Sequence, residues 1–266
     1  MRVRALKLGR HELRMFILRV MEGTNSSRGS WPNAQRNQMN VQDLQQLKTL
    51  ASFSAPHLEK LASELFIKTF EKNEIVFDQD EEAKFIYLLL SGIVRVSYIN
   101  SHERQTIVSL LPAGAFFGID SLIPQAHHAF RCEAFDGCTI GSIKPQTFVE
   151  IFLATPYDNF LRWYTATIHP GRNAYVHCIK GIGLDLRQRL ALELLNLADR
   201  FGTTDSRGIS IALNISHEVL AGIVGASRQQ VTEYLNSFDR EKIIFREGRR
   251  IIVNIERLGK ILEGAA

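Results

Sequence analysis

The feature that most constrains this 266-residue chain is the stretch Ser216–Phe238, which predicts two short helices joined by a sharp turn. Ser216 is placed to cap the first helix, and Ser227 to cap the second, where Gln230 completes a capping box. Gly225 ends the first helix, because glycine adopts a left-handed backbone at little cost. The apolar residues of both segments recur at helical spacing, and we expect them to face a core: Val219, Leu220, Ile223, Val231, Tyr234, Leu235 and Phe238.

Two helices joined by so short a turn cross closely, and the crossing needs a small side chain. Ala221 supplies it four residues before Gly225, and Val231 follows six residues after that glycine. This spacing is typical of a helix-turn-helix, whose second helix can enter the major groove of DNA. The alternative is an ordinary αα-hairpin whose polar face is merely solvated.

The following segment favours the first interpretation. Ile243–Asn254 predicts a β-hairpin that turns at Glu247 and Gly248 and forms a wing beside the second helix. At the start of that helix, Arg228 can present donors to guanine, and Gln229 can pair with adenine. Contacts to phosphate, which position a protein without reading sequence, are expected from the two helix starts and the wing: Ser216, His217, Ser227, Gln230, Arg246, Arg249 and Arg250.

Upstream, between Phe66 and Ile143, the sequence changes to short runs of β-branched and aromatic residues separated by Gly, Asn and Asp. Strands at such intervals predict an antiparallel barrel or roll. Helical spacing precedes this region over residues 41–65 and returns after it over 144–180. Nearer the C-terminus, residues 202–214 predict a loop and then a short strand.

A hinge is expected between these two parts. Gly181 and Gly183 flank a break, and Asp185 with Gln188 predicts a capped start for the strong helix Leu186–Phe201. We assign the hinge to Gly181, Gly183 and Asp185. The chain is therefore expected to be α+β: an N-terminal antiparallel, jelly-roll-like β-roll, a long central helix and a C-terminal winged helix-turn-helix.

Composition indicates a globular protein. With 45% hydrophobic and 23% charged residues, the chain fits one large or two ordinary domains. Three scattered cysteines, Cys132, Cys138 and Cys178, argue against a disulfide framework and for a reducing compartment. No apolar run reaches the roughly 18 residues that span a bilayer. We expect a soluble cytoplasmic protein without a membrane partner.

The net charge of +4 is unevenly distributed. Residues 1–38 carry eight Lys or Arg and two Asp or Glu, whereas the remainder carries 24 basic and 26 acidic residues. Bulk charge is therefore no argument that the body of the chain binds DNA. Residues 1–40 are expected to be a disordered basic extension, and translation starting at Met39 is an equal alternative.

Four segments in order, LLLSGIVRV, LPAGAFFG, LDLRQRLALELLNLA and ISHEVLAGIVGASRQQV, resemble the CRP/FNR transcription regulators, and the resemblance covers nearly all of residues 41–263. It implies a cyclic-nucleotide-binding-like roll at 41–155, a dimerisation helix and hinge at 156–183, and a winged helix-turn-helix at 184–266. It also implies a homodimer on a palindromic operator in double-stranded DNA, with RNA polymerase as a further partner.

The effector site departs from that family. In members that bind cyclic AMP, the turn after a Phe-Gly pair gives a Glu to the ribose and an Arg-Ser pair to the phosphate. The corresponding effector positions here, with two adenine positions last, are Phe117, Gly118, Ile119, His128, Ala129, Ala174 and Tyr175. A phosphate buried without a cation is costly, so the resemblance implies an atypical pocket or no effector. The missing Arg also argues against 2-oxoglutarate.

No cofactor is predicted, although haem stays an alternative. The iron-sulfur cluster of the FNR branch needs N-terminal cysteines, and none precedes Cys132. Candidate haem ligands are His127, His128, His169, His177, Cys132, Cys138 and Cys178. We interpret His127 and His128 instead as loop residues and the cysteines as core fillers. Five apolar residues either line a pocket for a small ligand or simply pack the roll: Phe116, Phe117, Ile119, Leu122 and Ile123.

A metal-dependent enzyme of the related barrel type is the remaining alternative. It needs a His-x-His with a nearby Glu, and the sequence contains no His-x-His. The sequence also lacks a phosphate loop, a nucleophile elbow and a zinc-spaced Cys/His set. We therefore predict a regulator and no enzyme.

Two further departures concern helices. Pro170 and Gly171 fall inside the expected dimerisation helix, and proline there predicts a kink near His169. In the recognition helix, Gln229 and Glu233 stand where the family has Glu and Arg. Because Gln prefers adenine and Glu can accept from cytosine, we expect an operator that differs from TGTGA but keeps one G·C pair per half-site.

Overall fold

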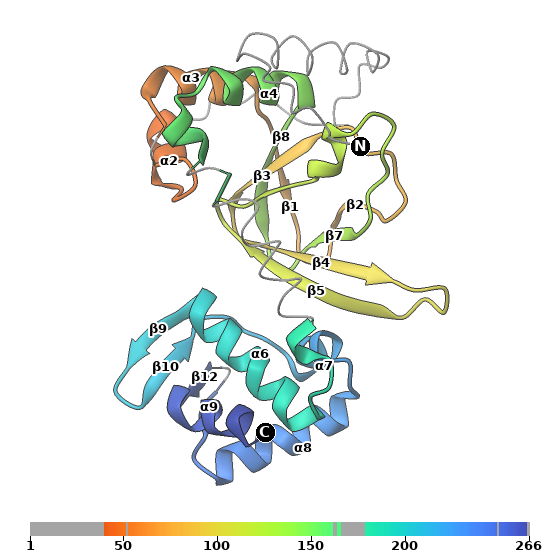
Figure 1. Ribbon diagram of the computed structural model, residues 1–266, viewed down its shortest axis with the longest axis vertical. Coiled ribbons are helices and arrows are strands. Elements are labelled where there is room, and N and C mark those ends of the chain that lie inside the picture. The colour runs from red at the N-terminus through yellow and green to blue at the C-terminus, as the bar shows by residue number, and fades with distance from the viewer. Residues whose placement is uncertain (1–39, 52, 162–163, 166–178, 249, 265–266) are drawn as a thin grey trace, which may run out of the picture. The chain divides into compact units, whose positions relative to one another are not determined.

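The computed structural model describes residues 40–51, 53–161, 164–165, 179–248 and 250–264, which fall into two compact units (Figure 1). The first unit holds residues up to 99 together with 110–165, and the second holds 100–109 together with 179–264. Some predictions lie outside the described residues: the extension at 1–39, the kink near Pro170, and the roles of Arg249, Ala174, Tyr175, His169, His177 and Cys178.

Two four-stranded antiparallel sheets build the roll of the first unit. The strand order is β1-β8-β3-β6 in one sheet and β2-β7-β4-β5 in the other. The strands are β1 (Phe66–Phe70), β2 (Ile75–Phe77), β3 (Ile86–Ser91), β4 (Ile93–Ile99), β5 (Gln105–Pro112), β6 (Phe116–Phe117), β7 (Arg131–Ala134) and β8 (Cys138–Ile143). Because neighbours such as β1 and β8 are distant in sequence, the strands close into a roll, and this part of the predicted fold is confirmed.

Three helices lie together at one end of the roll (Figure 1): α2 (Val41–Gln46), α3 (Ala55–Glu64) and α4 (Pro145–Ala154). Their apolar faces share one core with the β1-β8-β3-β6 sheet, where Leu58 of α3 and Phe152 of α4 join Ile86 and Leu88 of β3. Pro145 stands in the first turn of α4, where a missing N–H costs nothing.

A second core draws on both sheets of the roll. Tyr87 and Leu89 of β3 belong to it, whereas Ile86 and Leu88 belong to the core under the helices. Successive side chains of a strand point to opposite faces, so β3 is buried on both. This explains why its sequence is an unbroken apolar run and not an alternating one.

The second unit is a winged helix-turn-helix, as predicted. Its sheet has the order β11-β12-β10-β9. Its elements are α6 (Leu186–Phe201), β9 (Gly202–Asp205), β10 (Gly208–Ile211), α7 (His217–Val224), α8 (Arg228–Arg240), β11 (Ile244–Glu247), β12 (Arg250–Val253) and α9 (Ile255–Glu263). The capping box predicted at the start of α6 is confirmed, since Asp185 accepts from the Gln188 N–H at 2.8 Å and Gln188 accepts from the Asp185 N–H at 3.1 Å.

Two elements of this unit differ from the sequence prediction. Residues 202–205, expected in a loop, form the exposed strand β9, because pairing with β10 supplies the hydrogen bonds that local propensity does not indicate. The helix α9 was not expected at all, although Asn254 caps it and Leu258 is buried on its inner face. The signal was present, since Ile255, Leu258 and Ile261 recur at helical spacing.

Candidate functional site

The helix-turn-helix geometry is confirmed in detail. The Ser216 and Ser227 hydroxyls each accept a hydrogen bond at 3.2 Å from the backbone N–H three residues on, which caps α7 and α8. Gly225 lies at φ 65° and ψ 48°, a left-handed conformation in which a side chain would be strained. Ala221 is buried, as a close helix crossing requires, and its carbonyl accepts from the Ala226 N–H at 3.0 Å.

The core-facing stripes differ partly from the prediction. Leu235 and Phe238 are fully buried on α8, as expected. On α7 the buried positions are Leu220, Ala221 and Val224, whereas Val219 and Ile223 are only partly buried, and so is Tyr234 on α8. The expectation of a Val219 and Ile223 core face is therefore wrong, because the turn at Gly225 rotates the inner stripe of this short helix by one position.

The start of α8 presents three side chains to solvent: Arg228, Gln229 and Glu233. Gln229 Nε2 donates to Glu233 Oε1 at 3.0 Å, so these two residues orient each other one turn apart. The Arg228 side chain has no hydrogen-bond or ion-pair partner among the described residues. Its guanidinium can therefore meet a ligand without first breaking a contact.

The other residues predicted to face phosphate gather at the two helix starts. Ser216 and Ser227 act as caps, and Gln230 accepts from the Ser227 N–H at 3.1 Å to close a capping box. His217 Nδ1 lies 2.8 Å from Thr232 Oγ1, which joins the start of α7 to the first turns of α8. Thr232 was not predicted, and its only signal was its place one turn after Arg228.

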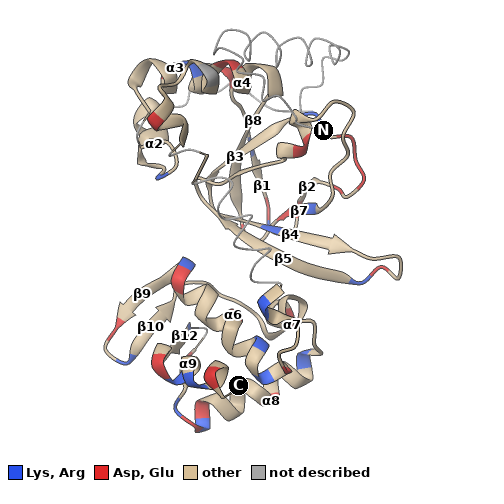
Figure 2. Cartoon of the chain, viewed as in Figure 1, with Lys and Arg blue, Asp and Glu red and all other residues tan. Residues whose placement is uncertain are grey.

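The wing turns at Gly248, where φ is +60°. Arg246 on β11 is held by Asp239 of α8, with its Nη2 3.1 Å from Oδ2, whereas Arg250 on β12 is exposed. Acidic and basic residues are mixed over this unit (Figure 2). The candidate interface is therefore defined by particular side chains and not by a uniformly basic surface.

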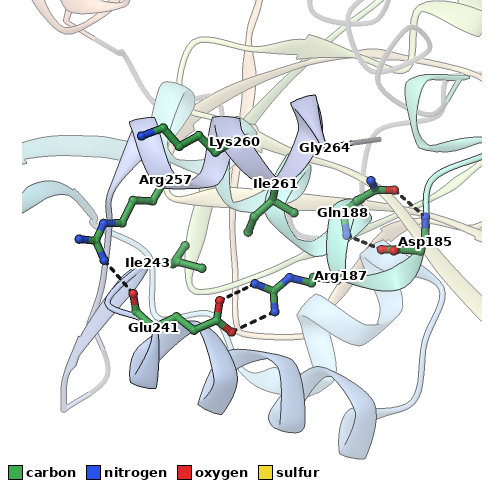
Figure 3. Close-up of a pocket in the computed structure, with 9 residues that line it drawn as sticks. All are labelled: Asp185, Arg187, Gln188, Glu241, Ile243, Arg257, Lys260, Ile261 and Gly264. Atoms are coloured by element: carbon green, nitrogen blue, oxygen red, sulfur yellow. Dashed lines mark hydrogen bonds and ion pairs between the residues drawn. The ribbon is translucent and has the colours of Figure 1, made fainter. Parts of the chain in front are cut away.

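A pocket of about 460 Å³ lies where the start of α6 meets the end of α8 and α9 (Figure 3). Arg187 pairs with both carboxylate oxygens of Glu241 at 3.0 and 2.6 Å, and Arg257 donates to the Glu241 carbonyl at 2.8 Å. Hydrogen bonds from Arg187 and Ser237 hold the pKa of Glu241 down at about 2. These contacts join the recognition helix to α6, so the pocket is a structural joint.

The expected hinge residues precede α6. Gly183 has φ +89°, in the range that favours glycine, while Asp185 is fixed as the N-cap. The neighbouring Arg189 donates to the carbonyls of Leu184 and Val224, each at 3.1 Å, which fastens the end of this turn to α7.

In the roll, the predicted effector positions are filled by packing. Phe117 stacks on Tyr87 with ring centroids 5.2 Å apart. Gly118 has φ +70°, and a Cβ there would lie 2.6 Å from the Tyr87 ring, so only glycine fits. Ile119 opens the short 3-10 helix η1 (Ile119–Leu122) and is partly buried.

His128 corrects a sequence interpretation, because it is not a surface loop residue. Its side chain is 1% exposed, and its ring stacks on Phe77 with centroids 3.7 Å apart. Its Nδ1 has no hydrogen-bond partner among the described residues, and the nearest carboxylate oxygen, Asp120 Oδ2, is 3.5 Å away. His127 and Ala129 on either side are exposed. An imidazole thus occupies the interior of the roll at this position.

The five apolar residues considered for a pocket do not line one. Phe116 belongs to the core under the helices and Phe117 to the core between the sheets. Ile123 is 63% exposed. The packing interpretation is therefore the better one.

The thiols are core residues. Cys132 and Cys138 are buried, and burial raises the pKa of both, that of Cys138 to about 11. They are protonated at neutral pH, which makes them poor thiolate ligands. Within the described ranges, no three His, Cys, Asp or Glu side chains are grouped so that they could hold a metal ion.

A β-roll followed by a winged helix-turn-helix defines a class of DNA-binding regulators. Residues 67–155 match the family described as "Cyclic nucleotide-binding domain", and residues 188–261 match "Crp-like helix-turn-helix domain". Together these matches cover more than half of the chain, which belongs to the CRP/FNR family of transcription regulators. Its members are regulators and not enzymes, as the sequence predicted.

Relatives agree with this assignment. The chain is 26% identical over 195 residues to the global nitrogen regulator of Nostoc sp., which covers 71% of this chain and 85% of that protein. It is 28% identical over 206 residues to the transcriptional regulator LdrP of Thermus thermophilus, covering 75% of this chain and 100% of that protein. Another CRP-family regulator from Thermus thermophilus has a solved structure that matches with a TM-score of 0.60 and 25% identity, over 74% of this chain and 96% of that one.

Among the helices that the structure describes, none has both the length and the apolar character needed to cross a membrane.

Proposed function

We propose that this chain is a homodimeric transcription regulator that binds a palindromic operator without a cyclic-nucleotide effector. The observation that carries the proposal is Arg228, exposed and unpaired among the described residues at the capped start of α8. An arginine there can form two hydrogen bonds with guanine in the major groove. Gln229 and Glu233 read the neighbouring bases, and the helix caps and the wing contact phosphate.

Exposed apolar side chains support a dimer. They flank residues 166–178, and a second copy of the chain would cover them: Tyr157, Leu161, Tyr164, Ile179 and Ile182. Ile182 is 79% exposed, which is unusual for an isoleucine in a monomeric protein. A two-fold symmetric protein matches a palindromic site, with half-sites about 34 Å apart. RNA polymerase is the further partner that we propose.

The residues of the roll do not fit a cyclic nucleotide. His128 is packed on Phe77 inside the roll, and the carboxylate nearest its Nδ1 is that of Asp120. An anion brought there would face a negative group and would find no arginine. Ile119, at the ribose position, offers no hydrogen bond. A buried phosphate would therefore lose its hydration without compensation.

Selection of bound sequences from random duplex DNA by the purified full chain, with no ligand added, tests this proposal. We expect an enriched palindrome that contains one G·C pair per half-site. Selections repeated with cyclic AMP and with haem are expected to return the same palindrome with the same enrichment. Enrichment only with an added ligand would overturn the effector-free proposal, and no enrichment under all conditions would overturn sequence-specific binding.

A further inference from the structure

His217 occupies a position that joins the two helices of the DNA-binding motif. It is the first residue of α7, it is partly buried, and its Nδ1 lies 2.8 Å from Thr232 Oγ1 on α8. A histidine in a predicted phosphate interface can carry a charge or none near neutral pH. Which ring nitrogen holds the proton decides what it can offer to DNA.

The Thr232 hydroxyl fixes the tautomer of the neutral ring. Thr232 Oγ1 donates to the Arg228 carbonyl at 2.8 Å, and a carbonyl can only accept. A hydroxyl has a single hydrogen, so in its contact with His217 it must accept, and Nδ1–H donates. The neutral imidazole therefore carries its hydrogen on Nδ1 and leaves Nε2 as a lone pair.

A lone pair on Nε2 cannot bind a phosphate oxygen, because both are acceptors. Only the protonated ring, with N–H groups at both nitrogens, donates to phosphate while keeping its bond to Thr232. Arginine would make the same contact at any pH.

The charges around His217 keep it neutral in the absence of DNA. Burial, then Arg246 of β11 and Arg228 of α8, lower the pKa of His217. The acidic groups nearby are Glu218 on its own helix, Glu233, which is bonded to Gln229, and Asp239, which is bonded to Arg246. Phosphates that bind the two arginines add negative charge and reverse the balance.

We propose that DNA binding by this chain takes up one proton from solvent at His217 in each half-site, so that the affinity for the operator rises as pH falls. The proposal rests on the proposed function and specifies one contact in it. The proton comes from water or buffer, adds to Nε2 and is released when the DNA dissociates.

The test is fluorescence-anisotropy titration of the selected palindrome between pH 5.5 and 8.5 at constant ionic strength. Calorimetry in buffers of different ionisation enthalpy counts the protons taken up. We expect affinity to fall with rising pH by up to about tenfold per pH unit for each proton, hence up to about 100-fold for a dimer. His217→Arg should bind with little pH dependence, and His217→Gln should bind more weakly, also with little pH dependence.

Thr232→Val separates this mechanism from a purely structural role of His217. Without the hydroxyl, the neutral ring can place its hydrogen on Nε2 and donate to phosphate, so proton uptake should decrease while binding is retained. His102→Gln, at an exposed histidine in the turn after β4, should keep the full pH dependence.

Specific binding that is independent of pH in the unmodified chain would overturn the proposal and leave the proposed function standing. So would a pH dependence that persists in His217→Gln. Absence of specific binding at every pH would overturn both.

Discussion

In the helix-turn-helix, Arg228 stands exposed at a capped helix start, whereas in the roll His128, at the position implied for phosphate binding, is buried against Phe77. The caps of α7 and α8 satisfy the backbone and leave the reading side chain unpaired. In the roll, the corresponding region has joined the core. A position that keeps its ligand retains an accessible polar group, and a position that has lost its ligand is filled by packing.

The comparison extends to the supporting contacts. Gly225 and Gly118 both have positive φ, yet a Cβ at Gly225 would meet nothing within 4 Å, whereas one at Gly118 would meet the Tyr87 ring at 2.6 Å. The turn of the DNA-binding motif is therefore constrained by its backbone alone. The turn of the roll is constrained by backbone and by tight packing, which leaves no room for a ligand beside Tyr87.

The largest effect is expected from Phe238→Ala. Phe238 is fully buried in the second unit, and Arg187 lies over its ring at 5.0 Å. Its loss should reduce the free energy of unfolding of this unit by about 3–5 kcal/mol and abolish DNA binding near 37 °C. Urea unfolding followed by circular dichroism measures the change.

Phe70→Ala is the matched variant in the roll, since Phe70 is only 1% exposed. It should destabilise the first unit by a similar amount and leave the transition of the second unit in place. One shared transition that shifts equally in both variants would show that the two units do not unfold separately.

His128→Arg places a guanidinium where the roll now holds a buried imidazole. We expect a loss of roughly 2–4 kcal/mol in the free energy of unfolding of the first unit, because the charge is desolvated and its nearest carboxylate is partly exposed. Thermal unfolding measures it, with His102→Arg at an exposed site as the control. A stable variant that gains affinity for cyclic AMP would show that the roll still has room for a phosphate.

These contrasts also explain which features sequence could predict. The caps at Ser216, Asp185 and Ser227 and the turn at Gly225 follow from local chemistry, and all four are confirmed. Such signals act within one or two helical turns, so no tertiary information is needed.

The burial of His128 could not be read in the same way. Its neighbours in sequence are exposed, and Phe77, on which it stacks, is 51 residues away. The strand β9 depends in the same manner on β10, and the Arg187–Glu241 pair joins residues 54 apart. Contacts at such separation depend on the whole fold, which local patterns do not encode.

Arg228→Ala tests the exposed side of the comparison. It should weaken binding by about 1–3 kcal/mol per half-site and relax the preference for the G·C pair that Arg228 contacts. Competition titrations with operators substituted at that pair measure both effects. Arg250→Ala is the control, because a wing arginine on phosphate should weaken binding equally on all sequences. Equal loss on all operators in Arg228→Ala would mean that Arg228 contacts only the backbone.

The smallest effect is expected from the surface ion pairs of the two units, which should behave alike. Hydrogen bonds from Arg187 and Ser237 hold the pKa of Glu241 at about 2, below its ordinary 4.5. Arg131 likewise lowers the pKa of Asp78 in the roll from its ordinary 3.8. A depressed carboxyl pKa contributes stability above the unfolded-state pKa, and this stability is lost as pH falls through the folded-state pKa. For Glu241 the loss should occur between pH 4.5 and 2. Because both carboxylates are solvent-exposed, each contribution should stay below about 1 kcal/mol. Glu241→Gln should flatten the pH dependence of the second unit only, and Asp78→Asn that of the first only, in urea titrations from pH 7 to 2.5. If either variant flattened both transitions, the two units would be coupled in folding, and the contrast between an accessible DNA site and a filled roll could not be assigned to separate units.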